Sequence, residues 1–560
     1  MPLLICLTFV FIMLGWGIFF TTVLKTDLSI GLFNAGAFAS LLMFYSFLLA
    51  NPVWMAWFVL IFGGIISALT FASLVRVRGN AITIAAYILL FALSFLTAYG
   101  LKFSSIDDYS FWGTISKYLF IFNELPTNDH YISASYLTYT PGMASFHYLI
   151  YTLAHQYSQL LGYIAQGLIL IAAMLVFFDA KEPARSSAYL GIWLILFTLA
   201  YGTVFARMQV DAFVAAYVLA IAWLIYKRGH NAYNLIFIPL IFLSVIKEIG
   251  MLFAICSLTL LVFVEKPNRK IITRAFVLLA AVLITKVLWT LHTDAYGFHN
   301  FSQGASFTNA LKALNPFNAY YHIVQLLYLK ALFFKNFDML LKLPYCLWYL
   351  LIAGLWVRAA RFAPFSPLGR RVGDEGRGYC HGNRINQILG ILTLFIFIYI
   401  LTLYFLQALV FDVGHGNQEI LAFQRYYNML FLPLLGMAIF LTIDTMELSS
   451  LCKVHNPGFK AIFIVLLVLL IGGKIERTQR FHNTYDLYAL TAAIQTKTAH
   501  MTDSNWSMCL INPPDPTYVV NMPLTYFFMP HRLYQKTALE DSSACNIIVK
   551  WDNVGGVTIT

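Results

Sequence analysis

The sequence predicts an all-α polytopic membrane protein. We expect roughly 13 or 14 transmembrane helices, interfacial helices in the outer loops and a small C-terminal α/β domain on the outer surface. The 560 residues are 60% hydrophobic and only 11% charged, which lies outside the usual range of soluble domains. Apolar runs long enough to cross a bilayer recur along the chain, with Lys and Arg concentrated in the short loops between them. These observations disfavour a large soluble protein with an oversized core.

The basic loops set the orientation of the spans. Cytoplasmic loops of membrane proteins carry an excess of Lys and Arg, so we place all of these loops in the cytoplasm. The chain has a net charge of +11, but its basic residues lie mainly in loops between apolar runs, which argues against nucleic acid as a partner. The loops carry Arg76 and Arg78, Lys181 and Arg185, Lys227 and Arg228, Lys266 to Arg274, Arg358 to Arg384, and Lys453 and Lys460.

The apolar runs then alternate consistently across the bilayer. The first run lacks a basic n-region and a small-residue cleavage site, which predicts a retained span rather than a signal peptide. The alternation places residues 101–158, 292–340, 411–427 and 475–560 on the outside. The spans are predicted near 3–24, 28–50, 53–74, 81–100, 159–180, 187–205, 210–226, 232–246, 249–264, 275–291, 341–357, 387–410, 428–446 and 461–474.

The chain becomes polar after residue 475, which favours a small domain outside the membrane. We expect a helix over 484–499 and strands over 506–511 and 545–551. Cys509 and Cys545 share this outer compartment, so a disulfide between them is as plausible as two free thiols.

The most informative feature of the outer loops is a pair of adjacent carboxylates, Asp107 and Asp108, that follows the span at 81–100. An aromatic, amphipathic segment over 109–122 comes next and is predicted to lie along the membrane interface. Tyr139-Thr140-Pro141-Gly142 then breaks the chain before a short apolar helix over 143–155. Asp is also a common helix cap, so spacing alone leaves open that the pair merely caps the helix at 109–122.

This arrangement resembles the first outer loop of the GT-C superfamily, the membrane glycosyltransferases that use polyprenyl-phosphate or polyprenyl-diphosphate sugars. Those enzymes have an acidic residue after a span, an interfacial helix and a break that is often Tyr-Pro-Pro, where this chain has Tyr139-Thr140-Pro141. Further elements follow in the order of the family over about residues 81–440. They are Arg207 to Asp211 at the start of a span, Lys247-Glu248 between two apolar segments, and Arg425-Tyr426 before a span that contains Pro433.

The resemblance implies that Asp107 or Asp108 is the catalytic base and that Tyr139, Asp211, Glu248 and Tyr426 bind substrate. The residues themselves give a reason for a phosphate site. Charges near spans are costly and are functional candidates, and Arg207, Lys247 and Arg425 would all lie at the outer ends of spans. Together they could neutralise a lipid phosphate, although Lys247 could instead pair with Glu248 or extend to the interface.

The histidines and cysteines show no spacing typical of a metal site, so we predict no metal and no cofactor, with a divalent cation left open at the acidic loop. The expected partners are the lipid bilayer, a polyprenyl-linked sugar donor and a glycan, lipid or protein acceptor. Two other classes stay open. One is an O-antigen polymerase or ligase, in which the acidic pair is incidental, and the other is a transporter, which would favour internal repeats and charges at the bilayer midplane.

These expectations divide the chain into five parts. The predicted localisation is a bacterial inner membrane with the site facing the periplasm. The parts are additional N-terminal helices at 1–80, a GT-C-like catalytic module at 81–357 with its outer loop at 101–158, a basic cytoplasmic linker at 358–386, further membrane helices at 387–474 and the outer domain at 475–560.

Overall fold

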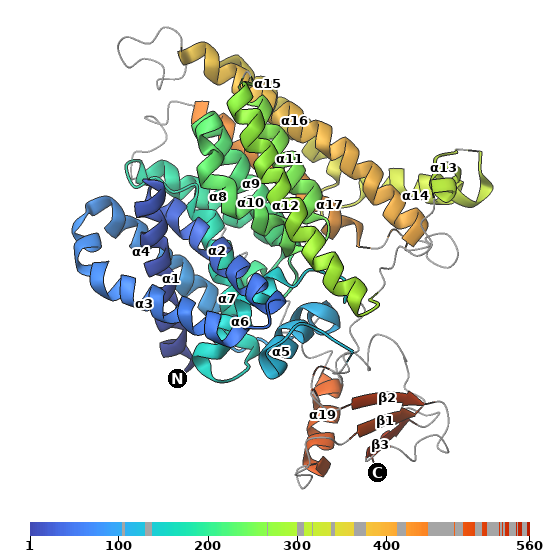
Figure 1. Ribbon diagram of the computed structural model, residues 1–560. Coiled ribbons are helices and arrows are strands. Elements are labelled where there is room, and N and C mark those ends of the chain that lie inside the picture. The colour runs from blue at the N-terminus through green and yellow to red at the C-terminus, as the bar shows by residue number, and fades with distance from the viewer. Residues whose placement is uncertain are drawn as a thin grey trace.

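The computed structural model (Figure 1) describes most of the first 445 residues and short stretches after them. The predicted span at 461–474 lies outside the described residues. The described ranges are 1–103, 107–128, 137–298 except 266, 307–337 except 316, 342–362, 377–410, 420 and 422–445, and then 475, 485–498, 507–511, 526, 529, 532–536, 545, 547–551 and 557–559.

The described part of the chain is dominated by helices, as the sequence predicts. Nine helical segments of the described residues are long and apolar enough to cross a membrane, which indicates an integral membrane protein. Each predicted span up to residue 446 coincides with a helix. The bundle helices are α1 (Pro2–Leu24), α2 (Leu28–Leu48), α3 (Pro52–Arg76), α4 (Arg78–Ala98), α7 (Gln159–Leu175), α8 (Pro183–Tyr201), α9 (Asp211–Arg228), α10 (Tyr233–Ile246), α11 (Gly250–Phe263), α12 (Arg269–Ala295), α15 (Tyr345–Phe362), α16 (Arg377–Phe405) and α17 (Phe423–Thr445).

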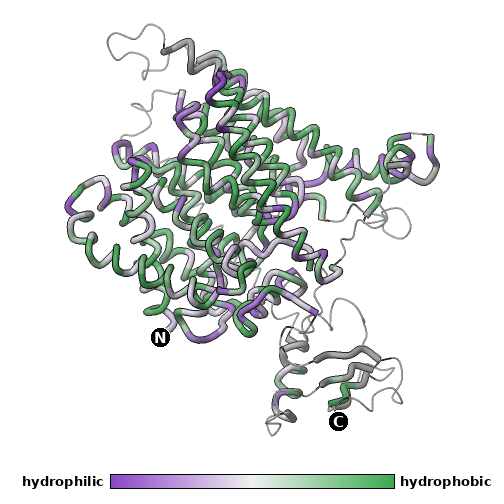
Figure 2. The backbone as a smooth tube through the Cα atoms, in the orientation of Figure 1, coloured by the Kyte–Doolittle hydropathy of each residue, from purple (hydrophilic) through white to green (hydrophobic). Residues whose placement is uncertain are grey.

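Large apolar side chains cover the outside of the bundle. Trp54 on α3 and Phe276 on α12 are 81% and 71% exposed, and Figure 2 shows hydrophobic colouring along most of the bundle helices. A soluble monomer rarely exposes apolar surface on this scale, whereas a membrane protein presents it to lipid tails. This surface is a second indication of a bilayer, independent of helix length.

Helix α9 is the centre of the bundle and is buried along its length. It packs against α17, α10 and α11. Both α9 and α17 are apolar in the middle and carry charges near their ends, with Arg425 and Asp444 nineteen residues apart on α17. At 1.5 Å per residue these two side chains start about 29 Å apart, close to the thickness of a hydrocarbon core.

The charges gather into two groups at opposite ends of α9 and α17. At the Asp444 end, Lys227 lies 2.7 Å and Arg185 3.9 Å from Asp444, and Arg228 lies 3.7 Å from Asp27. Two of the predicted basic loops, those with Arg185 and with Lys227 and Arg228, therefore meet at one end. That this end faces the cytoplasm stays a prediction.

The connection between α10 and α11 is the feature that brings Lys247 into the bundle. Each helix has only 14 residues, or about 21 Å, which is shorter than a full span. The chain turns over residues 247–249, and a Cβ on Gly250 would collide with the carbonyl oxygen of Leu243. The tight return between two short helices thus leaves Lys247 buried.

Short helices cover the opposite end from Asp444. A π-helical turn, η1 (Asp108–Trp112), continues into α5 (Gly113–Phe122), and α6 (Gly142–Ala154) follows the predicted break. The other short helices there are α13 (Phe307–Leu314) and α14 (Ala319–Phe334), within the predicted outer segment 292–340.

The C-terminal part contains α19 (Tyr485–Thr498) and a four-stranded sheet, which Figure 1 shows below the helical bundle. Helix α19 and two of the strands coincide with the predicted elements, but an outer-surface domain built from them stays a prediction. Cys545 is disulfide-bonded, while the side chain of Cys509 lies outside the described part, so their pairing also stays a prediction. The strand order is β2-β1-β3-β4, with β1 (Ser507–Ile511) parallel to β2 (Arg532–Lys536) and β3 (Ile547–Trp551), and β4 (Val557–Ile559) antiparallel to β3.

Candidate active site

Four charged side chains from four separate segments form one connected group, which we call the outer cluster: Asp107, Asp211, Lys247 and Arg425. Lys247 Nζ lies 2.5 Å from Asp211 Oδ1, and Arg425 Nε lies 3.1 Å from Asp211 Oδ2. Arg425 Nη1 donates to Asp107 Oδ2. All four are residues for which the sequence predicted a role, and the fold brings them together.

Burial differs sharply across the outer cluster. The side chains of Asp211 and Lys247 are only 2% and 6% exposed, whereas that of Asp107 is 31% exposed. Arg425 lies between them at 22%. The cluster therefore has a buried base, formed by Asp211 and Lys247, and an accessible edge, formed by Asp107 and the guanidinium of Arg425.

Tyr426 packs against both cations of the outer cluster. Lys247 Nζ lies 4.6 Å and the guanidinium carbon of Arg425 4.8 Å from the centre of its ring. The hydroxyl of Tyr426 also accepts a hydrogen bond from Arg425 Nη2 at 3.0 Å. These contacts fix the direction of the guanidinium fork, because cation–π and hydrogen-bonding contacts hold it on two sides.

The two adjacent carboxylates have different environments. Asp108 is fully buried, and its Oδ1 accepts the backbone N–H of Met208 at 3.1 Å. Asp107 accepts from Gln209 Nε2 at 2.6 Å as well as from Arg425. Asp107 precedes η1 but makes no side-chain capping bond. Asp107 is therefore more than a helix cap, because two long-range donors, Gln209 Nε2 and Arg425 Nη1, both contact its Oδ2.

The π-helical turn determines how the acidic pair is presented. A π-turn inserts an extra residue into a helix and is common at functional sites. Here a Cβ on Gly113 would collide with the ring of Phe103 and with the carbonyl oxygen of Asp108, so only glycine allows this close approach. Gly142 plays a similar part at α6, where a Cβ would meet the carbonyl oxygen of Val245, two residues before Lys247.

The other predicted residues lie around the outer cluster in different ways. The ring of Tyr139 packs against Phe111 and Trp112 of the π-turn, at 5.6 and 5.9 Å between centroids. Arg207 directly precedes Met208, and its side chain is half-buried. Glu248 pairs with Lys286 at 2.6 Å, so the suggestion that Lys247 pairs with Glu248 is wrong.

Sequence reasoning missed two contributors. The motif from Arg207 to Asp211 includes Gln209 but does not predict its bond to Asp107, and local sequence does not predict the contact of Lys286 with Glu248. A polar residue two positions before Asp211 was the one available signal for Gln209. The signal for Lys286 was a lone charge inside an apolar helix, which is a functional candidate by default.

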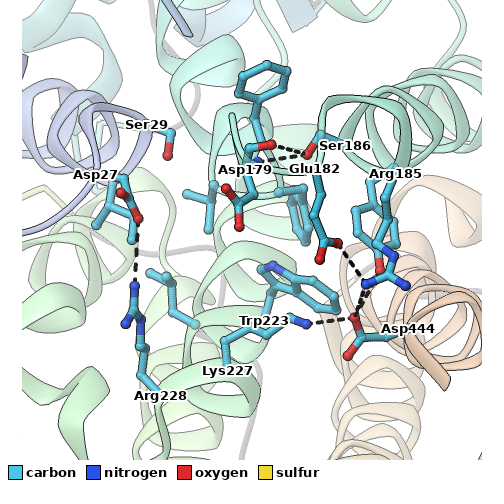
Figure 3. Close-up of a pocket in the computed structure, with 16 residues that line it drawn as sticks. Asp27, Ser29, Asp179, Glu182, Arg185, Ser186, Trp223, Lys227, Arg228 and Asp444 are labelled. Atoms are coloured by element: carbon cyan, nitrogen blue, oxygen red, sulfur yellow. Dashed lines mark hydrogen bonds and ion pairs between the residues drawn. The ribbon is translucent and has the colours of Figure 1, made fainter. Parts of the chain in front are cut away.

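A cavity of about 300 Å³ lies at the opposite end, around Asp444 (Figure 3). Most of its charged side chains pair with one another. Asp444 is held by Lys227 at 2.7 Å and by the hydroxyls of Tyr226 and Tyr189 at 2.9 and 3.2 Å. Arg185 pairs with Glu182, and Figure 3 shows Arg228 facing Asp27 on the other side of the cavity. These contacts between charged side chains indicate that this group holds the ends of the helices together.

Among the described residues, no three His, Cys, Asp or Glu side chains are grouped as a metal site would require. The absence of a metal and of a cofactor stays a prediction. No family model, no curated protein and no solved structure matches the chain. The chemistry of the outer cluster is therefore argued from its geometry, which offers an accessible carboxylate beside an arginine fork at the end of a membrane bundle.

Proposed function

We propose that the protein is a GT-C-type membrane glycosyltransferase, which moves a sugar from a polyprenyl-phosphate or polyprenyl-diphosphate donor to an acceptor at the outer face of the membrane. The observation that carries the proposal is the outer cluster. Residues 107, 211, 247 and 425 lie far apart in sequence, yet their charged side chains form one continuous chain of ion pairs.

Arg425 is the centre of the proposed donor site. It is shared between the buried carboxylate of Asp211 and the accessible carboxylate of Asp107. A lipid phosphate would compete with Asp107 for the guanidinium, because Asp107 is the more exposed partner and a phosphate accepts the same bidentate pattern. Asp211 and Lys247 would keep Arg425 in place during this exchange.

In the proposed reaction, Asp107 acts as the general base. It takes the proton of an acceptor hydroxyl while the hydroxyl oxygen forms a bond to the anomeric carbon of the sugar. The bond between that carbon and the phosphate oxygen breaks, and the lipid phosphate leaves with the electron pair. Arg425 neutralises the departing phosphate, which needs no general acid. Asp108 holds the turn through the N–H of Met208 and does not react.

The position of the outer cluster favours a lipid-borne donor. Arg425 starts about 29 Å from Asp444 along α17, close to the thickness of a hydrocarbon core, which supports a site near the depth of a lipid phosphate. Exposed apolar side chains on α14, such as Leu326 and Phe334, offer a surface for an isoprenoid tail. Donor and acceptor would then meet at the boundary between lipid and water.

The rest of the proposal concerns location. The protein would lie in a bacterial inner membrane with the outer cluster on the periplasmic side, in keeping with basic loops at the Asp444 end. The C-terminal elements would form a small outer-surface domain near the acceptor, which would be a glycan, lipid or protein of the cell envelope.

The test is transfer of radiolabelled sugar from a polyprenyl-phosphate donor to extracted envelope acceptors. Membranes with the wild-type protein are compared with membranes that contain Asp107→Asn or Asp108→Asn at matched expression. Loss of a general base costs about 10²–10⁴-fold. We expect that loss for Asp107→Asn and a smaller loss for Asp108→Asn, whose amide oxygen still accepts from Met208. Full transfer by both variants would mean that the acidic pair is structural, and would instead support a polymerase, ligase or transporter.

A further inference from the structure

We propose that a slot formed by Phe103, Tyr109, Lys117, Tyr157 and Gln159 is the docking site for Tyr526 of the chain's own C-terminal segment, and that Tyr526 is a positioning residue for Asp107. The docking itself is independent of the chemistry, whereas the positioning role rests on the function proposed above.

Both ends of Tyr526 are held by polar contacts from the membrane part of the chain. Its hydroxyl accepts from Gln159 Nε2 and donates to the hydroxyl of Tyr157, each at 2.9 Å. Its backbone carbonyl accepts from Lys117 Nζ at 2.6 Å. A side chain fixed at its tip and at its backbone has a defined place in the slot, which an apolar contact alone would not provide.

Aromatic rings enclose the side chain of Tyr526 between those two ends. The ring centroids of Phe103 and Tyr109 each lie 5.3 Å and that of Tyr157 6.0 Å from it, in tilted or edge-on arrangements that aromatic pairs favour. Tyr526 is only 2% exposed, and Met529, three residues later, is 7% exposed and belongs to the same apolar core as the membrane helices.

The surroundings of Lys117 indicate that the slot holds little water. Its ammonium lies 5.1 Å from the centre of the Tyr526 ring as well as on the Tyr526 carbonyl. Burial lowers the pKa of Lys117 from 10.5 to about 8, because the charged form has lost most of its water.

The slot shares its wall with the acidic turn. Tyr109 is the second residue of the π-turn that begins at Asp108, and its hydroxyl donates to the carbonyl of Phe103 at 2.7 Å. Phe103 also packs against Gly113 at the end of that turn. Tyr526 therefore touches both residues that brace the turn, and its removal would loosen the segment that presents Asp107 to Arg425.

The first measurement is amide hydrogen exchange of residues 107–119 in the full-length protein in lipid nanodiscs. Tyr526→Ala removes the ring and the hydroxyl. Tyr526→Phe keeps the ring and removes the hydroxyl with its bonds to Gln159 and Tyr157, whereas Tyr157→Phe removes the bond between the two hydroxyls. We expect exchange at least tenfold faster in Tyr526→Ala and an intermediate increase in both Phe variants. Tyr534→Phe, a tyrosine of strand β2 in the same C-terminal part, serves as the matched control and should leave this exchange unchanged.

Unchanged exchange in Tyr526→Ala would overturn the docking, whether or not sugar transfer is ever detected. The second measurement is steady-state sugar transfer by the same variants. A positioning role predicts that kcat falls at least tenfold in Tyr526→Ala with little change in the KM for the donor, and that Tyr526→Phe recovers part of the loss. Faster exchange with unchanged kcat would refute the positioning role. A wild-type protein that lacks transferase activity would refute the proposed function, and the exchange result would still decide the docking.

Discussion

Removal of the ammonium of Lys247 tests the buried base of the outer cluster. In Lys247→Met the side chain keeps its length and loses its charge, so the carboxylate of Asp211, which is 2% exposed, retains Arg425 as its charged partner. Loss of one partner from a buried ion pair costs about 3–5 kcal/mol. Because Arg425 Nε remains 3.1 Å from Asp211, we expect the lower end of that range, about 3 kcal/mol.

The assay is reversible unfolding in mixed detergent micelles, read as the free energy of unfolding. The double variant Lys247→Met/Asp211→Asn removes both charges and should recover most of the loss, with a coupling energy of at least about 1 kcal/mol. Glu182→Gln is the control, since Glu182 belongs to an i,i+3 pair and is 48% exposed, and such a pair contributes at most about 1 kcal/mol. A cost below about 1 kcal/mol for Lys247→Met, or strictly additive effects in the double variant, would refute the paired, buried base.

Three further predictions concern other parts of the molecule. Burial lowers the pKa of His147 on α6 from 6.5 to about 3, so the unfolded chain binds more protons than the folded protein between these pH values. The stability that depends on this difference is complete above about pH 6.5 and falls as the pH drops toward 3. Between pH 7 and pH 5, the free energy of unfolding should therefore fall less in His147→Gln than in the wild type. The lysine of Arg425→Lys cannot contact Asp107, Asp211 and the Tyr426 hydroxyl at once, so the rate of sugar transfer should fall at least tenfold, which corresponds to about 1.4 kcal/mol. Transfer at the wild-type rate would contradict a role for the forked guanidinium of Arg425. Asp444→Asn leaves Lys227 without its buried carboxylate and should lower the free energy of unfolding by about 3 kcal/mol. The KM for the donor should be unchanged, and a raised KM would show that the two ends of the bundle are coupled.

The membrane helices were predictable because length and hydropathy alone decide whether a segment can cross a bilayer. The predicted spans up to residue 446 coincide with helices, and the basic side chains Arg185, Lys227 and Arg228 lie at one end of the bundle as expected. The helix after residue 484 and the strands near 507 and 547 were predictable from the local pattern of apolar and polar residues.

The pairing of charges was not predictable, because it depends on contacts between distant segments. Asp107 and Arg425 are separated by 318 residues, and nothing in either neighbourhood specifies the other. Adjacency suggested a pair of Lys247 with Glu248, yet the two side chains of a turn point apart, and each finds a partner on another helix, Asp211 and Lys286 respectively. The cap interpretation of Asp107 was incomplete for the same reason, since local spacing cannot reveal a long-range donor such as Gln209.

Binding of a polyprenyl phosphate to the purified protein in nanodiscs tests most directly whether the outer cluster is the donor site. The Kd is compared for the wild type, for Arg425→Gln and for Lys227→Gln, which removes a cation from the opposite end of the bundle. A charged hydrogen bond is worth about 1.5–3 kcal/mol, so Arg425→Gln should weaken binding by about ten- to a hundredfold, and Lys227→Gln should leave it unchanged. Equal affinity in the wild type and Arg425→Gln, or a loss confined to Lys227→Gln, would contradict a donor site at the outer cluster.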